Sequence, residues 1–151
     1  MTMTYREPKS VLVVDDDPWI CGMLSTLLGG EGYSVTEAAD GKQGLQLAAR
    51  NEPDVILLDL AMPGESGLDV LHSLKGSTST RNIPVIVVSG HTKWVHGIDA
   101  GRADGVIQKP FDLMELLTTV EQATESRRSG QPLGAEPVSI GPADRTYRRA
   151  A

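Results

Sequence analysis

The stretch at residues 54–63 constrains the fold more than any other part of the sequence. Residues 55–58 read Val-Ile-Leu-Leu, an apolar run too short for a helix that lies between Pro53 and Pro63. Such a run is typical of a strand buried on both faces, and these strands occur mainly in parallel sheets covered by helices. The run ends in Asp59, at the edge where open α/β sheets place their ligands. Asp59 is therefore either an ordinary turn or capping residue or part of a ligand site.

Four other segments have strand character. Apolar runs at residues 10–14, 84–88 and 105–108 predict three more strands, and residues 33–38 predict a weaker strand that suits a sheet edge. Between them, helical periodicity predicts five helices, which begin near Asp17, Asp40, Ser66, Thr92 and Asp112. Alternation of five strands with five helices predicts an α/β fold, a doubly wound five-stranded parallel sheet with helices on both faces.

Several helices carry specific local signals. Asp17 before Pro18 is a good N-cap, while Asp40 and Asp112 each open a capping-box pattern. The segment at residues 92–102 has only a thin apolar stripe, which predicts a short or irregular fourth helix. The side chains expected to face inward on the second and fifth helices are Leu45, Ala48, Ala49, Leu113, Leu116, Leu117 and Val120.

The length suits one domain with a core of its own. We expect this domain at residues 10–125, with flexible segments at residues 1–9 and 126–151. No apolar stretch is long enough to span a membrane and no signal peptide is evident, which predicts a cytoplasmic protein without membrane contact. The single cysteine, Cys21, excludes an intrachain disulfide and fits a buried helix position.

The charge is acidic overall but uneven. The net charge is −6, which argues against general nucleic-acid binding by the folded part. Five arginines against three acids give the last 28 residues a charge of +2, so the preceding 123 residues carry −8. A cation or a basic partner would bind to this acidic part. The tail is too short and too polar for a DNA-binding domain, and DNA is an unlikely partner of this chain.

Chemistry-bearing residues follow the predicted strands. Because parallel strands share one carboxyl edge, we expect these residues to converge there: Asp15, Asp16, Asp59, Ser89 and Lys109. Clustered carboxylates raise each other's pKa unless a cation is present, and their oxygens suit Mg²⁺ or Mn²⁺. A carboxylate such as Asp59 can attack phosphorus to form an acyl phosphate, with Lys109 and Ser89 supporting the phosphoryl oxygens. The plainer alternative for Lys109 is a solvated lysine that pairs with Asp59.

Four motifs in order now point to a family. They are Val13-Val14-Asp15-Asp16-Asp17-Pro18, the stretch from Val55 to Gly67, Val87-Val88-Ser89-Gly90-His91, and Gln108-Lys109-Pro110-Phe111. Together they closely resemble the receiver domains of bacterial two-component response regulators, over about residues 10–125. The resemblance implies a flavodoxin-like fold with strand order 2-1-3-4-5.

The resemblance also implies roles for individual residues. Asp59 would accept a phosphoryl group from a sensor histidine kinase or a histidine phosphotransfer protein. Mg²⁺ would be held by Asp15, by Asp16 and by the backbone carbonyl of Ala61, next to Asp59. Ser89 would be the switch hydroxyl that moves toward the phosphoryl group. By the same resemblance, Lys109 would pair with the phosphoryl group and precede a cis peptide to Pro110.

The sequence departs from the family pattern at several positions. Val106 stands where the family often has a switch aromatic, so coupling by a rotating ring is not available. Ala61 and His91 occupy positions that tune phosphoryl lifetime in the family. Arg102 replaces a usual glycine in a stretch that is shortened by about two residues.

These features predict a stand-alone receiver, a regulatory phosphoacceptor domain and not an enzyme. Its output would be contact with an unknown downstream protein through the fourth helix, fifth strand and fifth helix, and a homodimer is possible. Within the family, the alternatives are a phosphorelay shuttle and a receiver cut from a larger signalling protein. Outside this function, they are a Mg²⁺-dependent phosphohydrolase and a phosphorylation-independent scaffold. A hydrolase usually has a second acid two residues after its nucleophile, where this chain has Ala61.

Overall fold

The computed structural model describes residues 7–62, 67–90 and 103–129, and within them five strands and four helices. The predicted fourth helix at residues 92–102 and the predicted cap Ser66 lie outside the described residues. In chain order the elements are β1 (Ser10–Val14), α1 (Pro18–Gly30), β2 (Ser34–Ala38), α2 (Gly41–Asn51), β3 (Val55–Leu58), α3 (Gly67–Gly76), β4 (Val85–Ser89), β5 (Gly105–Gln108) and α5 (Leu113–Ser129).

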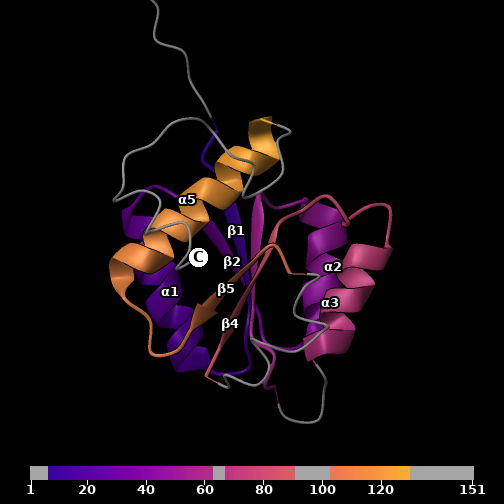
Figure 1. Cartoon of the computed structure of the whole chain (residues 1–151), viewed down its shortest axis with the longest axis horizontal. Coiled ribbons are helices and arrows are strands. Elements are labelled where there is room, and N and C mark those ends of the chain that lie inside the picture. Colours follow the sequence, from indigo (N-terminus) through magenta and orange to yellow (C-terminus); the bar gives the residue numbers. More distant parts are fainter. Residues whose placement is uncertain (1–6, 63–66, 91–102, 130–151) are drawn as a thin grey trace, which may run out of the picture.

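The five strands form one parallel sheet in the order β2-β1-β3-β4-β5, as predicted. Helices α1 and α5 cover one face of the sheet, and α2 and α3 cover the other (Figure 1). The register pairs Val14 of β1 with Leu58 of β3. The residues that follow these two, Asp15 and Asp59, therefore leave adjacent strands at the same level.

The core consists of two clusters, one on each face of the sheet. Every residue of β3 is at most 1% exposed, which explains its unbroken apolar sequence. Ile56 and Leu58 face the cluster under α2 and α3, while Val55 and Leu57 face the cluster under α1 and α5. This central strand is held from both sides, so it gives Asp59 a rigid base.

The predicted helix starts at Asp17 and Asp40 are confirmed. The Asp17 carboxylate accepts the N–H groups of Trp19 and Ile20, and Pro18 occupies the first helical turn. The Asp40 carboxylate accepts the N–H of Gln43, whose side chain in turn accepts the N–H of Ala39. These bonds satisfy N–H groups that a helix start would otherwise leave without partners.

Three expectations about the helices are wrong. Ala49 is exposed, since the inward stripe of α2 runs through Gly41, Gly44 and Ala48. Leu113 is 42% exposed because it sits at the first position of α5, beyond the covered part of the sheet. The helix continues to Ser129, past the boundary expected at residue 125, and contacts with the sheet edge hold its last turn.

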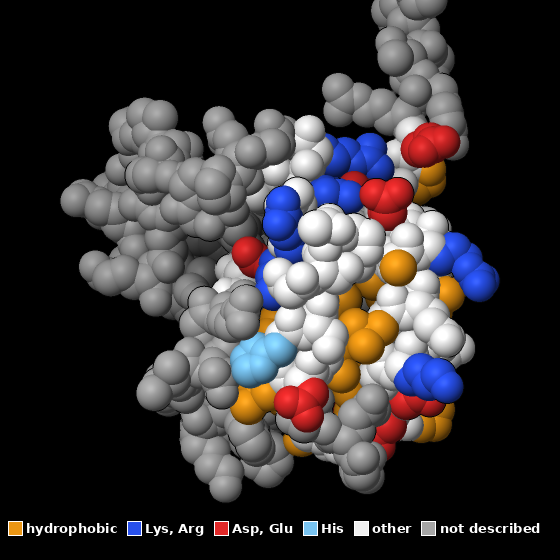
Figure 2. All heavy atoms as spheres, turned by 90° about the vertical axis from the view of Figure 1, so that its right-hand side faces the viewer, with side chains coloured by type: hydrophobic (Ala, Val, Ile, Leu, Met, Phe, Trp, Pro, Cys, Tyr) orange, Lys and Arg blue, Asp and Glu red, His pale blue; other side chains and the backbone are white. Residues whose placement is uncertain are grey.

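The face formed by α2 and α3 is a mixed surface. Figure 2 shows charged side chains of both signs around smaller areas of apolar side chain on this face. Such a mixture is usual for solvated helices that cover one side of a sheet. Within the described residues, no helix is long and apolar enough to cross a membrane.

Gly67 allows α3 to begin directly against the end of β3. A Cβ atom there would lie 2.3 Å from the Leu60 Cα atom and 2.8 Å from the Asp59 carbonyl oxygen. We therefore expect Gly67→Ala to lower the free energy of unfolding by about 1–3 kcal/mol in urea denaturation. As a matched control, Gly22→Ala in α1 meets no atom within 4 Å and should raise it by up to about 1 kcal/mol. Equal effects of the two substitutions would contradict this assignment.

Candidate functional site

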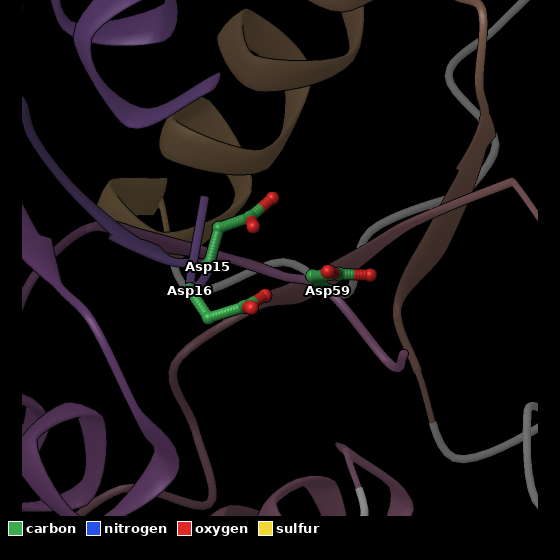
Figure 3. A group of neighbouring side chains, drawn as sticks. All are labelled: Asp15, Asp16 and Asp59. Carbon is green, nitrogen blue, oxygen red and sulfur yellow. The ribbon is translucent and has the colours of Figure 1, made fainter. Parts of the chain in front are cut away.

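Three predicted site residues converge at the carboxyl edge of the sheet. Side-chain oxygens of Asp15, Asp16 and Asp59 lie within 4.8 Å of one another. Figure 3 shows the three side chains grouped where β1 and β3 end. Asp15 and Asp59 are buried and Asp16 is exposed, so the cluster has a closed floor and an open side.

Backbone hydrogen bonds fix the two buried carboxylates. One oxygen of Asp15 accepts the N–H of Asp17 at 3.0 Å, and one oxygen of Asp59 accepts the N–H of Ala61 at 3.1 Å. The N–H of Asp59 itself donates to the carbonyl of Val14 at 3.0 Å. Each carboxylate therefore has one oxygen engaged by its own loop, which orients the other oxygen.

Lys109 reaches the cluster from the end of β5. Its Nζ atom donates to the second oxygen of Asp15 at 3.3 Å, and the two side chains are 25% and 5% exposed. The ion pair is thus with Asp15 and not with Asp59, the partner considered from sequence. The backbone N–H of Lys109 donates to the carbonyl of Ser89 at 2.8 Å, which ties the end of β5 to the end of β4.

The electrostatics of the cluster favour a cation. Burial raises the pKa of Asp15, and the charge of Asp59 raises it further. The Asp17 N–H and the Lys109 ammonium act in the opposite direction but do not cancel the rise. Three carboxylates with one ammonium leave negative charge uncompensated, and the donor set is oxygen only. Residues of this kind fit Mg²⁺ or Mn²⁺ well and zinc poorly.

The remaining predicted residues lie at the same edge. Ser89 is the last residue of β4, fully buried and paired with Gln108 of β5. Ala61 is exposed and follows Asp59 by two residues. The peptide between Lys109 and Pro110 is cis, as the family resemblance implied.

Of the positions that depart from the family pattern, Val106 is one that the structure places in the core. It is half-buried and packs against the cluster under α2 and α3. His91 and Arg102 lie outside the described residues.

The family model for the response regulator receiver domain matches residues 11–121. This range contains all five strands except Ser10 and every predicted site residue. The chain belongs to the response regulator receiver family. Receivers of this kind are regulatory domains of two-component systems and carry a phosphorylatable aspartate.

Known relatives agree with this assignment. The DNA-binding response regulator MtrA of Mycolicibacterium smegmatis is 37% identical over 136 residues, which cover 88% of this chain and 57% of that protein. The chain spans about half the length of the curated relatives it matches.

Solved structures confirm the flavodoxin-like fold of the receiver. A CheY-like receiver from Methanospirillum hungatei has a TM-score of 0.72 and 27% identity, covering 82% of this chain and 98% of that one. The response regulator TrrA of Thermotoga maritima, solved in complex with Mg²⁺ and BeF, has a TM-score of 0.71 and 30% identity. The likeness covers 76% of this chain and 98% of TrrA.

The sequence did not predict the contact between Cys21 and the site. The Cys21 thiol donates to the carbonyl oxygen of Asp15 at 3.2 Å, directly beneath the carboxylate cluster. The spacing of six residues across a loop and a helix start contains no motif that would indicate this bond. Cys21 is 3% exposed, as its apolar surroundings in the sequence predicted.

We expect the Cys21 thiol to be unreactive in the folded receiver. Burial and the nearby Asp15 charge raise its pKa from 9.0 to about 11. At pH 8 this leaves roughly one thiol in a thousand ionised, against about one in ten when the chain is unfolded. Modification by Ellman's reagent at pH 8 should therefore be at least tenfold slower in buffer than in denaturant. Similar rates in both solutions would contradict the buried placement.

Proposed function

We propose that the receiver is switched by phosphorylation of Asp59 in a Mg²⁺-dependent reaction. The observation that carries this proposal is the grouping of Asp15, Asp16 and Asp59 within 4.8 Å, with Lys109 at its border. Asp59 is the best acceptor of the three, because it is buried at the end of the central apolar strand and its carboxylate is oriented by Ala61. A relative solved with a phosphoryl mimic and Mg²⁺ supports the same chemistry.

The proposed reaction transfers phosphorus from nitrogen to oxygen. The Asp59 oxygen that is not bonded to Ala61 attacks the phosphorus, and the bond to the donor histidine nitrogen breaks as the new P–O bond forms. Lys109 leaves Asp15 and pairs with a phosphoryl oxygen. Ser89 donates its hydroxyl proton to another phosphoryl oxygen in a hydrogen bond.

The metal ligands in this proposal come from two strand ends. Asp15, Asp16, Asp59 and the backbone carbonyl of Ala61 would hold Mg²⁺, with Mn²⁺ as a substitute. The bound cation would offset negative charge on the carboxylates and on the phosphoryl group. The raised pKa of Asp15 is consistent with a site whose negative charge exceeds that of its protein partners.

The phosphoryl donor is proposed to be a sensor histidine kinase or a histidine phosphotransfer protein. The large hydrophobic side chains that are exposed among the described residues are Trp19, Leu113 and Met114, at 70%, 42% and 63%. Trp19 begins α1 after Asp17, and the other two begin α5 shortly after Lys109, so all three adjoin the carboxyl edge. Exposed apolar side chains beside an acceptor suit a protein donor better than a small one.

The output is proposed to be protein contact through β5 and α5, together with the segment at residues 91–102. A stand-alone receiver is one form of this proposal, with a cytoplasmic location, an unknown downstream protein and a homodimer as one possible assembly. The length of the relatives favours a second form, in which this receiver is part of a longer DNA-binding regulator. The intact mass of the native protein would decide between them, since the chain alone has 16.1 kDa.

We expect Asp59→Asn to abolish phosphoryl acceptance, because the substitution removes the nucleophilic oxygen. Incubation with acetyl phosphate and Mg²⁺ followed by intact-mass measurement should show one added phosphoryl group in the wild type and none in this variant. Asp17→Asn is the matched control: it also removes one carboxylate near the cluster and keeps a good helix cap. An adduct on Asp59→Asn would refute the assignment, and loss of the adduct in both variants would favour general electrostatic effects.

We expect Lys109→Met to bind Mg²⁺ more tightly than the wild type. The ammonium pairs with Asp15 and competes with the metal, so its removal should lower the dissociation constant roughly fivefold or more. The same variant should accept phosphoryl groups more slowly, since it cannot pair with the phosphoryl oxygens. Isothermal titration with Mg²⁺ tests the first effect, with Arg50→Met at the end of α2 as a charge-matched control. Weaker Mg²⁺ binding by Lys109→Met would contradict this placement.

A further inference from the structure

A second ionic site lies at the amino edge of the sheet, opposite the carboxylate cluster. Arg128, in the last turn of α5, donates from Nε to one oxygen of Asp54 at 3.1 Å and from Nη2 to the other at 2.9 Å. Its Nη1 and Nη2 atoms also donate to the carbonyls of Glu7 and Pro8, at 3.5 and 3.3 Å. Two parallel bonds to a carboxylate are the strong form of this pair. One guanidinium thus joins α5 to the segments that enter β1 and β3.

Asp54 is itself built into the sheet. Its N–H donates to the carbonyl of Ser10 at 2.9 Å, and its carboxylate accepts the Ser10 N–H at 2.9 Å. Burial alone would raise the pKa of Asp54, but hydrogen bonds from Arg128 and Ser10 hold it below its ordinary value. The carboxylate is therefore ionised at neutral pH, and its side chain is only 13% exposed. These contacts give Arg128 a fixed anchor.

The same construction occurs a second time on the other face. Asp104 precedes β5 as Asp54 precedes β3, and its carboxylate accepts the N–H of Val85, the first residue of β4, at 2.9 Å. It also pairs with Lys75 at the end of α3, at 2.6 Å. In both places, an aspartate before a strand joins the neighbouring strand to the carboxyl end of a helix. The helices differ in their place in the chain, because α3 leads on to β4 whereas α5 is the last described element, where the chain leaves the receiver.

Other contacts fasten the same end of α5. Lys9 pairs with Glu125, and Arg127 lies 4.0 Å from Glu52. The arginine pair with Asp54 is shorter than the Arg127 contact and more buried on the acidic side. Among these contacts it is the one that lies furthest along the helix.

We propose that Asp54 and Arg128 form a latch that fixes the point and direction at which the chain leaves the receiver. With the latch closed, α5 is one rod from the carboxyl edge beside Lys109 to the exit at Ser129, and anything attached beyond it is oriented by the sheet. With the latch open, the last turn at residues 126–129 unravels while the rest of the receiver stays folded. The latch therefore controls the length and stiffness of the connection to a following domain or segment. It is independent of the phosphoryl chemistry.

Amide hydrogen exchange on the full chain tests the latch. In Arg128→Met and in Asp54→Asn, exchange of the amides at residues 126–129 should be about tenfold faster or more, with the strands unchanged. Trypsin cleavage after Arg127, which both variants keep, should accelerate by a similar factor. Arg128→Lys keeps the charge but not both parallel bonds and should fall between Arg128→Met and the wild type.

Two control variants separate the latch from general loss of charge. Glu52→Gln removes a neighbouring carboxylate that faces α5, and it should leave exchange at residues 126–129 unchanged. Lys75→Met should accelerate exchange around Val85 and not in α5. Unchanged exchange in Arg128→Met would overturn the proposal. Acceleration throughout the sheet would overturn it as well, because the pair would then support the whole fold and not its exit.

Discussion

Repulsion among the carboxylates of Asp15, Asp16 and Asp59 is the constraint on which the rest of this structure depends. Ionised carboxylates this close disfavour one another, and two of the three are also buried. The arrangement persists because β1 and β3 are buried, apolar and held in fixed register, so their ends cannot separate. Backbone N–H groups and Lys109 offset part of the cost. The fold thus holds a site that is incomplete without a cation.

The two edges of the sheet treat charge in opposite ways. At the amino edge, Asp54 and Asp104 each have one basic partner and one backbone N–H from a neighbouring strand. At the carboxyl edge, three acids share the single ammonium of Lys109 among the described residues. Balanced pairs favour a permanent structure, while an excess of one charge favours a ligand that comes and goes. This contrast explains how one small domain can be rigid at one edge and responsive at the other.

The sequence predicted the sheet, its order and the carboxylate cluster, because these depend on local patterns and on the motifs shared with the family. Unbroken apolar runs identify buried strands, and acids directly after them must meet at one edge. It did not predict the partners of Lys109 and Arg128, which lie 94 and 74 residues away along the chain. The end of α5 was misplaced for the same reason: residues 126–129 have no helical periodicity of their own, and their helix is held by tertiary contacts. Leu113 shows the converse, since its helical spacing was right but no part of the sheet lies beneath it.

Lys109 links the chemistry of the site to the outer face of the receiver. Its ammonium pairs with Asp15, and the same charge cannot fully serve both Asp15 and a phosphoryl group on Asp59. Its backbone is bonded to Ser89, and α5 begins four residues later. A change of partner by Lys109 therefore acts on the junction of β4, β5 and α5 directly. With Val106 in place of an aromatic residue, we infer that this junction, and not a rotating ring in β5, carries the signal outward.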